Sequence, residues 1–285
     1  MDMLPIKLND HSVGIVLKEL VRRAIVTIRA ERFKFEATAK VGYDGSMTDV
    51  FTSADTAAQA LYESSFRECF PSVGMIGEED TPDIPCTIDG VDAYFTVDPL
   101  DGTKAFVRQQ SHGTSTMVAL VVDGEVASAW IGDINTQEIY GYRPGSDKVH
   151  RISEYEYSQY LHTQKFEQTI SNQYVLLRDP LSMAPTAVEK LANCFCKNHS
   201  DGGSIGTWMA RLWKGEFAGA IMDPGHQTPW DDTPLIGISQ KLGFVFLRSD
   251  GYDPWEEYEP ELVREVKARL HWTAIIHRSN LDQVL

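Results

Sequence analysis

The spacing of apolar residues predicts two helices in the first quarter of the chain. Between residues 12 and 30 the apolar positions recur every three or four residues, at Val13, Val16, Leu17, Leu20, Val21, Ala24 and Ile28. That period is typical of a helix with one buried face. A second helix is expected from about Ser53, where "TSAD" supplies capping side chains, and it should end before Pro71.

The pattern then changes from helical spacing to short apolar runs bounded by turn residues. The runs "VGMIG" (73–77), "AYFTV" (93–97) and "EIYGY" (138–142) are interpreted as strands. Residues 115–132, "STMVALVVDGEVASAWIG", are expected to form a hairpin, because Asp123-Gly124 between β-branched runs favours a two-residue turn.

The second half of the chain alternates between the two periods. Strands are expected at 173–177, 218–222, 244–247 and 273–276, and helices at 184–197, at 207–213, after Trp230 and at 261–270. The polar, aromatic stretch 150–168 is the best candidate for a seam between an N-terminal half, 1–150, and a C-terminal half, 151–285, of one compact unit. The sequence therefore predicts a layered α/β (α+β) fold with a hairpin-rich first half.

Composition limits the partners of this fold. The 285 residues are 42% hydrophobic and 24% charged, which suits one large domain or two halves with a shared interface. The formal net charge of −15, with no dense Lys/Arg run, disfavours nucleic acid as a partner. A negatively charged substrate would need a local positive centre, and bound metal ions are one way to supply it.

Cysteine usage and hydropathy indicate a cytoplasmic protein. Cys69, Cys86, Cys194 and Cys196 do not form a zinc-like pair of pairs, and the last two are expected to be small buried thiols within the predicted helix 184–197. A reducing compartment fits this pattern. The N-terminal stretch lacks a basic region followed by an apolar core, so no secretory signal is expected. No run of about 18 apolar residues occurs, so no membrane span is expected.

Five acids lie at strand ends or helix starts, where α/β folds place their ligands: Asp55, Glu78, Asp98, Asp101 and Asp231. Each alone is explained by a solvated turn or a helix cap. Together, carboxylates that converge without basic partners would repel one another and their pKa values would rise. A divalent cation removes that penalty, and hard oxygen ligands suit Mg²⁺.

The segment "VDPLDGT" (97–103) gives this hypothesis its local detail. Asp98 and Asp101, separated by a stiff Pro-Leu, could each hold a metal, or one of them could bridge two. Gly102 permits close backbone approach, and Thr103 begins a short helix whose free N–H groups favour a phosphate.

These residues also carry a resemblance to a known family. "IGEED" (76–80), "VDPLDGT" and "PWDD" (229–232) resemble, in that order, the three signature blocks of the inositol monophosphatase superfamily, which are Mg²⁺-dependent, lithium-sensitive phosphomonoesterases. "TDVFTSAD" (48–55) and "GSIGTWMARL" (203–212) are similar to two further segments of that family. The resemblance extends from about Lys40 to Gly243 and implies the family's αβαβα sandwich.

The resemblance implies a role for each matching residue. Glu78, Asp98 and the carbonyl of Leu100 would hold a first Mg²⁺, and Asp98, Asp101 and Asp231 a second, with a third ion possible beside Glu78; most of these ligands lie in the N-terminal half. Thr103, hydrogen-bonded to Asp55, would orient and help deprotonate the attacking water, so Thr103, Asp55 and Glu78 are the candidate catalytic residues. The amides of Gly102 and Thr103 would bind phosphate, and Gly206, Thr207 and Asp223 would contact the alcohol side of the substrate.

The chain departs from the best-known branch of the family at the positions that set substrate choice. Lys104-Ala105-Phe106 replaces the Thr-Asn-Phe common in inositol phosphatases, and is more similar to branches acting on 3′-phosphoadenosine nucleotides or histidinol phosphate. The family's inositol-binding acid lies seven positions before the acid of the Trp-Asp pair. Pro224 stands there, and Asp223 lies eight positions before Asp231. His226 is a further candidate substrate contact.

We therefore expect an enzyme that hydrolyses a small phosphomonoester, by default an inositol phosphate, with histidinol phosphate or 3′-phosphoadenosine 5′-phosphate as alternatives. The family resemblance also implies a homodimer. A reading of another class stays open, namely a metal- or phosphate-binding regulatory protein without turnover.

Overall fold

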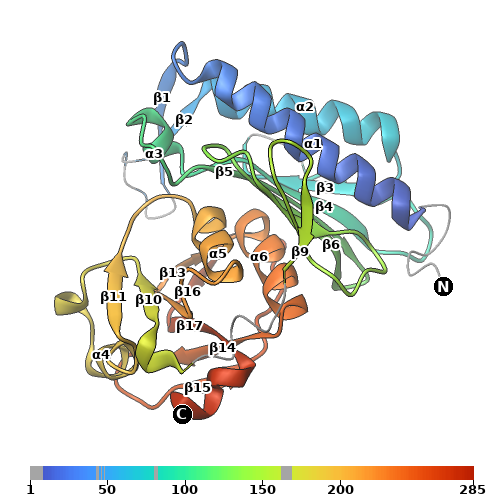
Figure 1. Cartoon of the computed structure of the whole chain (residues 1–285). Helices are drawn as coiled ribbons and strands as arrows, with labels where there is room; N and C mark the ends of the chain where they lie inside the picture. The colour runs from blue at the N-terminus through green and yellow to red at the C-terminus, as the bar shows by residue number, and fades with distance from the viewer. Residues whose placement is uncertain (1–8, 43–44, 46, 48, 80–82, 162–168) are drawn as a thin grey trace.

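The computed structural model describes residues 9–285 except 43–44, 46, 48, 80–82 and 162–168. Two sheets and three helical layers alternate in it, as an αβαβα sandwich (Figure 1). The layered fold predicted from the sequence is confirmed.

Two long helices form the first outer layer. Helix α1 (Asp10–Glu31) begins at Asn9, whose side chain accepts from the Ser12 amide at 3.0 Å. Helix α2 (Ser53–Cys69) begins with a capping box made by Thr52 and Asp55. Their apolar stripes pack on one face of the first sheet and bury a core that includes Val13, Leu17, Val21, Tyr62, Phe66, Phe95, Val118 and Trp130. Both predicted helices are confirmed.

The first sheet has seven strands in the order of their appearance: β3 (Gly74–Gly77), β4 (Ala93–Asp101), β5 (Ser115–Val122), β6 (Glu125–Asp133), β7 (Ile139–Tyr142), β8 (His150–Ile152) and β9 (Ser158–Tyr160). Strands β3 and β4 are parallel and the others pair antiparallel. Asp123 and Gly124 join β5 to β6 with φ of 49° and 82°, as a two-residue turn of this kind requires. The predicted hairpin is confirmed. An additional ribbon, β1 (Ala37–Lys40) with β2 (Asp49–Thr52), precedes α2.

The second sheet has the order β11 (Lys197–Ser200), β10 (Tyr174–Leu177), β12 (Gly219–Met222), β17 (Trp272–His277), β14 (Phe244–Ser249) and β15 (Glu256–Tyr258). Helices α5 (Ile205–Trp213) and α6 (Pro229–Lys241) lie between the two sheets, and α4 (Thr186–Ala192) covers the far face (Figure 1). Short helical segments are α3 (Thr103–Val107), η2 (Ile170–Asn172), η3 (Leu181–Met183) and η4 (Arg278–Gln283). A separate ribbon pairs β13 (Gly225–Gln227) with β16 (Lys267–Arg269).

Two helix predictions were wrong in extent or in kind. Helix α4 ends at Ala192, because Phe195 turns inward against Gly219 and the chain then runs parallel to β10 as β11. The thiols of Cys194 and Cys196 therefore lie outside the helix, and Cys196 is exposed.

The second error concerns residues 261–270, which are irregular, with a bend at 264–265, and then form β16. Leu262 and Val266 have helical spacing in the sequence, but both pack against the cluster formed by Ile76, Tyr94, Val121 and Trp230. Pairing of β16 with β13 then fixes the extended conformation.

The predicted boundary between the halves lies in residues 150–168, and the first part of this stretch still belongs to the first sheet. Residues 150–160 supply β8 and β9, and residues 162–168 lie outside the described part. The division into halves stays a prediction. Among the described residues, no helix combines the length and the hydropathy that a membrane crossing requires.

The aromatic packing beneath α2 generates a stability prediction. Phe95 on β4 is fully buried, and its ring stacks on Phe66 with 4.1 Å between centroids. We expect Phe95→Ala to lower the free energy of unfolding by about 3–5 kcal/mol, since it leaves a cavity in a packed core. Phe33→Ala is the control, because Phe33 is 84% exposed. Denaturant unfolding of both variants measures the difference, and equal small losses would contradict this view of the core.

Candidate metal centre

The carboxyl end of β4 is irregular, and this irregularity brings the side chains of Asp98 and Asp101 close together. The register between β4 and β5 shifts between Asp98 and Asp101. Asp98 is 2% exposed, and its Oδ1 atom has no hydrogen-bond partner among the described residues. Gly102 follows in the left-handed region at φ 84°, and a Cβ there would lie 2.2 Å from the Gly113 carbonyl oxygen. The segment therefore needs glycine at this position for reasons of packing as well as conformation.

Asp101 is fixed by one donor from β5 and two from the start of α5. Its Oδ2 atom accepts from the Ser115 hydroxyl at 2.8 Å, from the Gly206 amide at 2.8 Å and from the Ser204 hydroxyl. Ser204 is also the N-cap of α5, where its side chain accepts from the Thr207 amide. Three donors on one oxygen hold the carboxylate in a single orientation.

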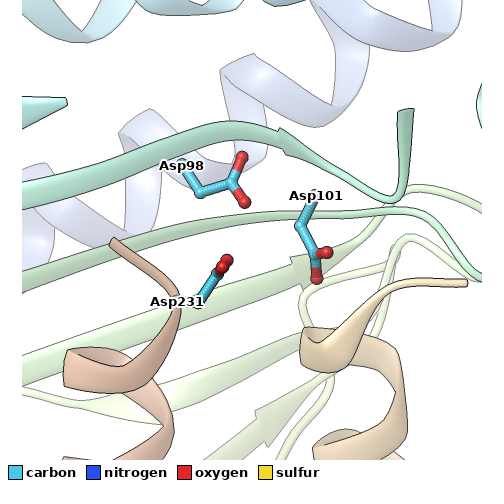
Figure 2. A group of neighbouring side chains, drawn as sticks. All are labelled: Asp98, Asp101 and Asp231. Atoms are coloured by element: carbon cyan, nitrogen blue, oxygen red, sulfur yellow. The ribbon is translucent and has the colours of Figure 1, made fainter. Parts of the chain in front are cut away.

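Asp231 reaches the same point from the start of α6. The N-cap Thr228 donates to Asp231 Oδ2 at 2.6 Å and accepts from the Asp231 amide at 3.3 Å. One carboxylate oxygen from each of Asp98, Asp101 and Asp231 lies within 4.8 Å of the other two. Figure 2 shows the three side chains directed toward a shared space from β4 and from the start of α6.

Burial and mutual repulsion disturb the protonation of these acids. Burial, and then the charges of Glu78, Asp231 and Asp101, raise the pKa of Asp98 well above its ordinary range. Burial and the charge of Asp101 raise the pKa of Asp231 to about 7. Burial also raises the pKa of Asp101, although the hydrogen bonds from Ser204, Gly206 and Ser115 oppose it. The site therefore favours ionised carboxylates only when a cation joins them.

Glu78 stands at the end of β3 and is paired differently. It lies outside the group of three close carboxylates. Lys40 Nζ contacts Glu78 at 3.0 Å and Glu79 at 2.6 Å. Burial raises the pKa of Glu78 to about 8, while Lys40 lowers it and Asp231 raises it. Burial would lower the pKa of Lys40, but the two glutamates raise it overall. Glu78 thus remains coupled to Asp98 and Asp231 through its charge.

Thr103 and Asp55 meet beside the three acids. The Thr103 hydroxyl lies 3.0 Å from the Leu100 carbonyl oxygen and 3.3 Å from Asp55 Oδ1. The other oxygen of Asp55 accepts from the amide and hydroxyl of Thr52 at 2.8 and 2.6 Å. Burial raises the pKa of Asp55 to about 6, and the bonds from Thr52 oppose the rise. The predicted Thr103–Asp55 pair is present.

The predicted substrate contacts fall into two groups. Gly206 and Thr207 are buried in the first turn of α5, where the Gly206 amide holds Asp101 and the Thr207 hydroxyl donates to the Ser204 carbonyl at 3.0 Å. Asp223 follows β12 and borders a cavity of about 170 Å³ together with Arg178, Asp179, Met183 and Trp272. Burial raises the pKa of Asp223, and Arg178 lowers it. Contact of these residues with a substrate stays a prediction.

Sequence reasoning missed several residues that hold the site together. Lys40 comes from the β1–β2 ribbon, which the apolar pattern did not reveal, and Ser115 is the first residue of β5. Ser204 had a signal, because it begins the "SIGT" helix start. Lys104, considered for substrate choice, lies 3.8 Å from Asp49 and is half-exposed. Thr48 and Asp80, which belong to two of the quoted blocks, lie outside the described residues.

The donor set fits Mg²⁺. All the close groups are carboxylate oxygens, the ligand type that this hard cation prefers. The unpartnered Oδ1 of buried Asp98 is an acceptor that lacks a donor among the described residues. A cation there would satisfy this atom and remove the repulsion between the three acids.

The model of the inositol monophosphatase family matches residues 9–274. The human protein 3′(2′),5′-bisphosphate nucleotidase 1 is 30% identical over 125 residues, which cover 36% of this chain and 39% of that protein. The match thus spans about two fifths of the curated relative's length.

Two solved structures share the fold across almost the whole chain. The extragenic suppressor protein suhB from Bartonella henselae superposes with a TM-score of 0.70 at 15% identity, covering 95% of this chain and 96% of the other. An IMPase/NADP phosphatase complexed with Mg²⁺ and phosphate gives a TM-score of 0.68 at 14% identity, covering 96% and 94%.

The raised pKa values predict how stability depends on pH without metal. In the folded state Asp231 and Glu78 have pKa values of about 7 and 8, against ordinary values of 3.8 and 4.5. At pH values between the ordinary and the raised pKa, these acids are protonated in the folded protein and ionised in the unfolded chain. The free energy of unfolding therefore falls as pH rises from about 4 to about 8. Mg²⁺ would bind the ionised carboxylates, so its stabilising effect should grow over the same range.

Thermal unfolding in EDTA and in Mg²⁺ at several pH values measures both effects. We expect the melting temperature in EDTA to drop by several degrees across this range. Asp231→Asn should flatten the pH dependence and weaken the effect of Mg²⁺. A metal-free melting temperature that rises toward pH 8 would contradict the assignment.

Proposed function

The chain belongs to the inositol monophosphatase family, a family of phosphoric monoester hydrolases, and we propose that it hydrolyses a small phosphomonoester with the help of Mg²⁺. The convergence of one buried and two half-buried carboxylates beside the Thr103–Asp55 pair carries this proposal. Such an arrangement is costly to a protein that makes no use of it, because each buried acid without a cation destabilises the fold.

Mg²⁺ would be held by Asp98, Asp101 and Asp231, with Glu78 and the Leu100 carbonyl as further ligands. Bound there, it would lower the pKa of a water molecule and stabilise negative charge on the attacking and leaving oxygens. Four carboxylates carry the charge that two divalent cations balance, which supports two ions; a third beside Glu78 would act with the negative charge of a phosphate.

The chain's own residues would manage the proton. The Thr103 hydroxyl accepts a proton from the attacking water as its own proton passes to Asp55 Oδ1, with which it is already hydrogen-bonded. Thr52 holds the opposite oxygen of Asp55, so the acceptor atom stays directed at Thr103. The backbone amides of Gly102 and Thr103 are proposed to bind phosphate oxygens. A pair of this kind supplies general-base catalysis without a histidine.

The leaving alcohol is proposed to lie toward Asp223 and the α5 start at Gly206 and Thr207. The cavity at Asp223 contains both charge signs and the indole of Trp272, which suits a polar leaving group with a ring. An inositol phosphate is the default substrate. Similarity to the human bisphosphate nucleotidase favours 3′-phosphoadenosine 5′-phosphate as the first alternative, and histidinol phosphate is the second.

Turnover separates the enzyme from a regulatory protein that merely binds metal and phosphate. Hydrolysis of an aryl phosphate that requires Mg²⁺ and is inhibited by Li⁺ supports the enzyme; tight Mg²⁺ binding without hydrolysis of any phosphomonoester tested supports the regulatory protein. We further propose a cytoplasmic homodimer, on the family resemblance and the unpaired cysteines. The polar, aromatic stretch 150–168 supports two halves, 1–150 and 151–285, with Asp231 supplied by the second.

Asp98 should be indispensable for turnover. Because its carboxylate is proposed to contact both metal ions, we expect Asp98→Asn to reduce kcat/KM on the order of a thousandfold or more while the chain still folds. Asp89→Asn, an exposed acid in the turn before β4, is the matched control. Steady-state assays with an aryl phosphate, together with circular dichroism, make the test. Near-normal turnover by Asp98→Asn would refute the metal assignment.

Thr103 tests the proposed proton path separately from metal binding. Thr103→Val keeps the shape of the side chain and removes the hydroxyl, so kcat should fall by roughly a hundredfold or more. Thr103→Ser should recover most of that loss, since its hydroxyl can still reach Asp55. Mg²⁺ affinity, followed by calorimetry, should change little in either variant. Equal kcat for the valine and serine variants would exclude the path.

A further inference from the structure

The β13–β16 ribbon connects two segments beside the candidate metal centre. Strand β13 lies between Asp223 and α6, the helix that carries Asp231. Its partner β16 pairs Arg269 with Gly225 and Lys267 with Gln227. The ribbon thus places a cation, Arg269, next to residues 223–228. These residues, called the turn below, separate Asp223, the proposed substrate contact, from Asp231, the proposed metal ligand.

Arg269 contacts this turn directly. Its Nη2 atom donates to the Asp223 carbonyl oxygen at 3.1 Å. A Cβ atom at Gly225 would lie 4.0 Å from the same nitrogen, so the guanidinium crosses close over the backbone of the turn. The Nε atom is buried and has no hydrogen-bond partner among the described residues. Arg269 is therefore packed into the structure, although its strand lies at the surface.

Arg269 also faces the acid that follows the metal ligand. Burial raises the pKa of Asp232 to about 6, and the charge of Arg269 opposes that rise. Asp232 in turn raises the pKa of Asp231 by its charge. The Asp232 Oδ2 atom is buried and lacks a partner in the described part of the chain, so the two side chains are coupled mainly through charge. Arg269 thus offsets an acid that would otherwise add to the repulsion in the metal centre.

The segment 261–269, which bears Arg269, is anchored to the first sheet. Arg264 donates to both carboxylate oxygens of Asp92 at 2.8 Å, and its guanidinium lies 4.1 Å from the centre of the Tyr94 ring. Leu262 and Val266 pack into the apolar cluster around Trp230. The segment therefore offers a firm support for Arg269.

We propose that Arg269 is a positioning residue that fixes Asp223 relative to Asp231, and thereby aligns the alcohol side of the substrate with the metal centre. It acts through its hydrogen bond to the Asp223 carbonyl oxygen and not through contact with the reacting atoms. The proposal rests on the function proposed above, since it assumes that Asp223 contacts the leaving group.

Kinetics with two substrates separate positioning from general damage. Arg269→Gln removes the charge and shortens the side chain, whereas Lys267→Gln on the same strand removes a lysine that is 44% exposed and paired with Glu261. The substrates are an aryl phosphate, whose leaving group lacks hydroxyls, and whichever of inositol 1-phosphate, histidinol phosphate and 3′-phosphoadenosine 5′-phosphate the wild type hydrolyses with the highest kcat/KM. Saturating Mg²⁺ is used throughout.

We expect Arg269→Gln to raise KM for the second substrate on the order of tenfold, the effect of losing one charge-assisted contact, while kcat for the aryl phosphate stays within about twofold. Arg269→Lys should recover part of the KM. The double variant Arg269→Gln, Asp232→Asn should keep the raised KM, because neutralising Asp232 does not restore the bond to Asp223. Lys267→Gln should behave as the wild type.

Amide hydrogen exchange gives a readout that does not depend on activity. Residues 223–228 should exchange faster in Arg269→Gln than in the wild type or in Lys267→Gln. Unchanged exchange there, an unchanged KM, or a parallel rise in KM for both substrates would overturn the proposal. If wild type hydrolyses no phosphomonoester, the proposed function fails; faster exchange at 223–228 would then still support the bond between Arg269 and the turn.

Discussion

The repulsion between Asp98, Asp101 and Asp231 is the constraint around which the molecule is organised. Three carboxylate oxygens within 4.8 Å of one another, largely removed from solvent, cannot all remain ionised without a cation. Each acid is kept in place by a different part of the structure. The β4 backbone positions Asp98, three hydrogen-bond donors to one oxygen orient Asp101, and the N-cap of α6 orients Asp231. None of these supports neutralises the charge, so full ionisation of the three acids would require a bound cation.

The sandwich explains how such a group can be assembled. Asp98 and Asp101 belong to the first sheet, while Asp231 and two of the three donors to Asp101, Ser204 and Gly206, lie at the starts of the helices packed between the two sheets (Figures 1 and 2). A shift of α5 or α6 against β4 would therefore separate the acids. Burial of Trp208, Trp213 and Leu235 in that middle layer resists such a shift, because every displacement would open a cavity in a close-packed core. The packing of the apolar core therefore also maintains the arrangement of the three acids.

Much of this was predictable from local sequence, and the rest depended on contacts between distant residues. The long helices, the Asp-Gly hairpin and the acids at strand ends follow from periodicity and turn chemistry, which act over a few residues. The pairing of Lys40 with Glu78 and Glu79, and of Ser115 with Asp101, joins residues whose proximity no local pattern encodes. The same limit explains the wrong helix at 261–270: Leu262 and Val266 have helical spacing, yet tertiary packing and the pairing of β16 determine their conformation. Family resemblance located the acids, but the supports around them required the fold.

Two of the proposed metal ligands belong to acidic doublets, Glu78-Glu79 and Asp231-Asp232. Glu78 is followed by Glu79, and Asp231 by Asp232, so each proposed ligand has a second acid next to it. Lys40 lies closer to Glu79 than to Glu78, and Arg269 offsets Asp232 rather than Asp231. Lys40 thus pairs with both acids of its doublet and Arg269 offsets Asp232, while the charges of Glu78 and Asp231 still raise the pKa of Asp98. The three close carboxylates of Asp98, Asp101 and Asp231 lie where a divalent cation and a phosphate would meet. A metal bound there would create the positive centre that the proposed anionic substrate requires, inside a molecule whose net negative charge repels that substrate.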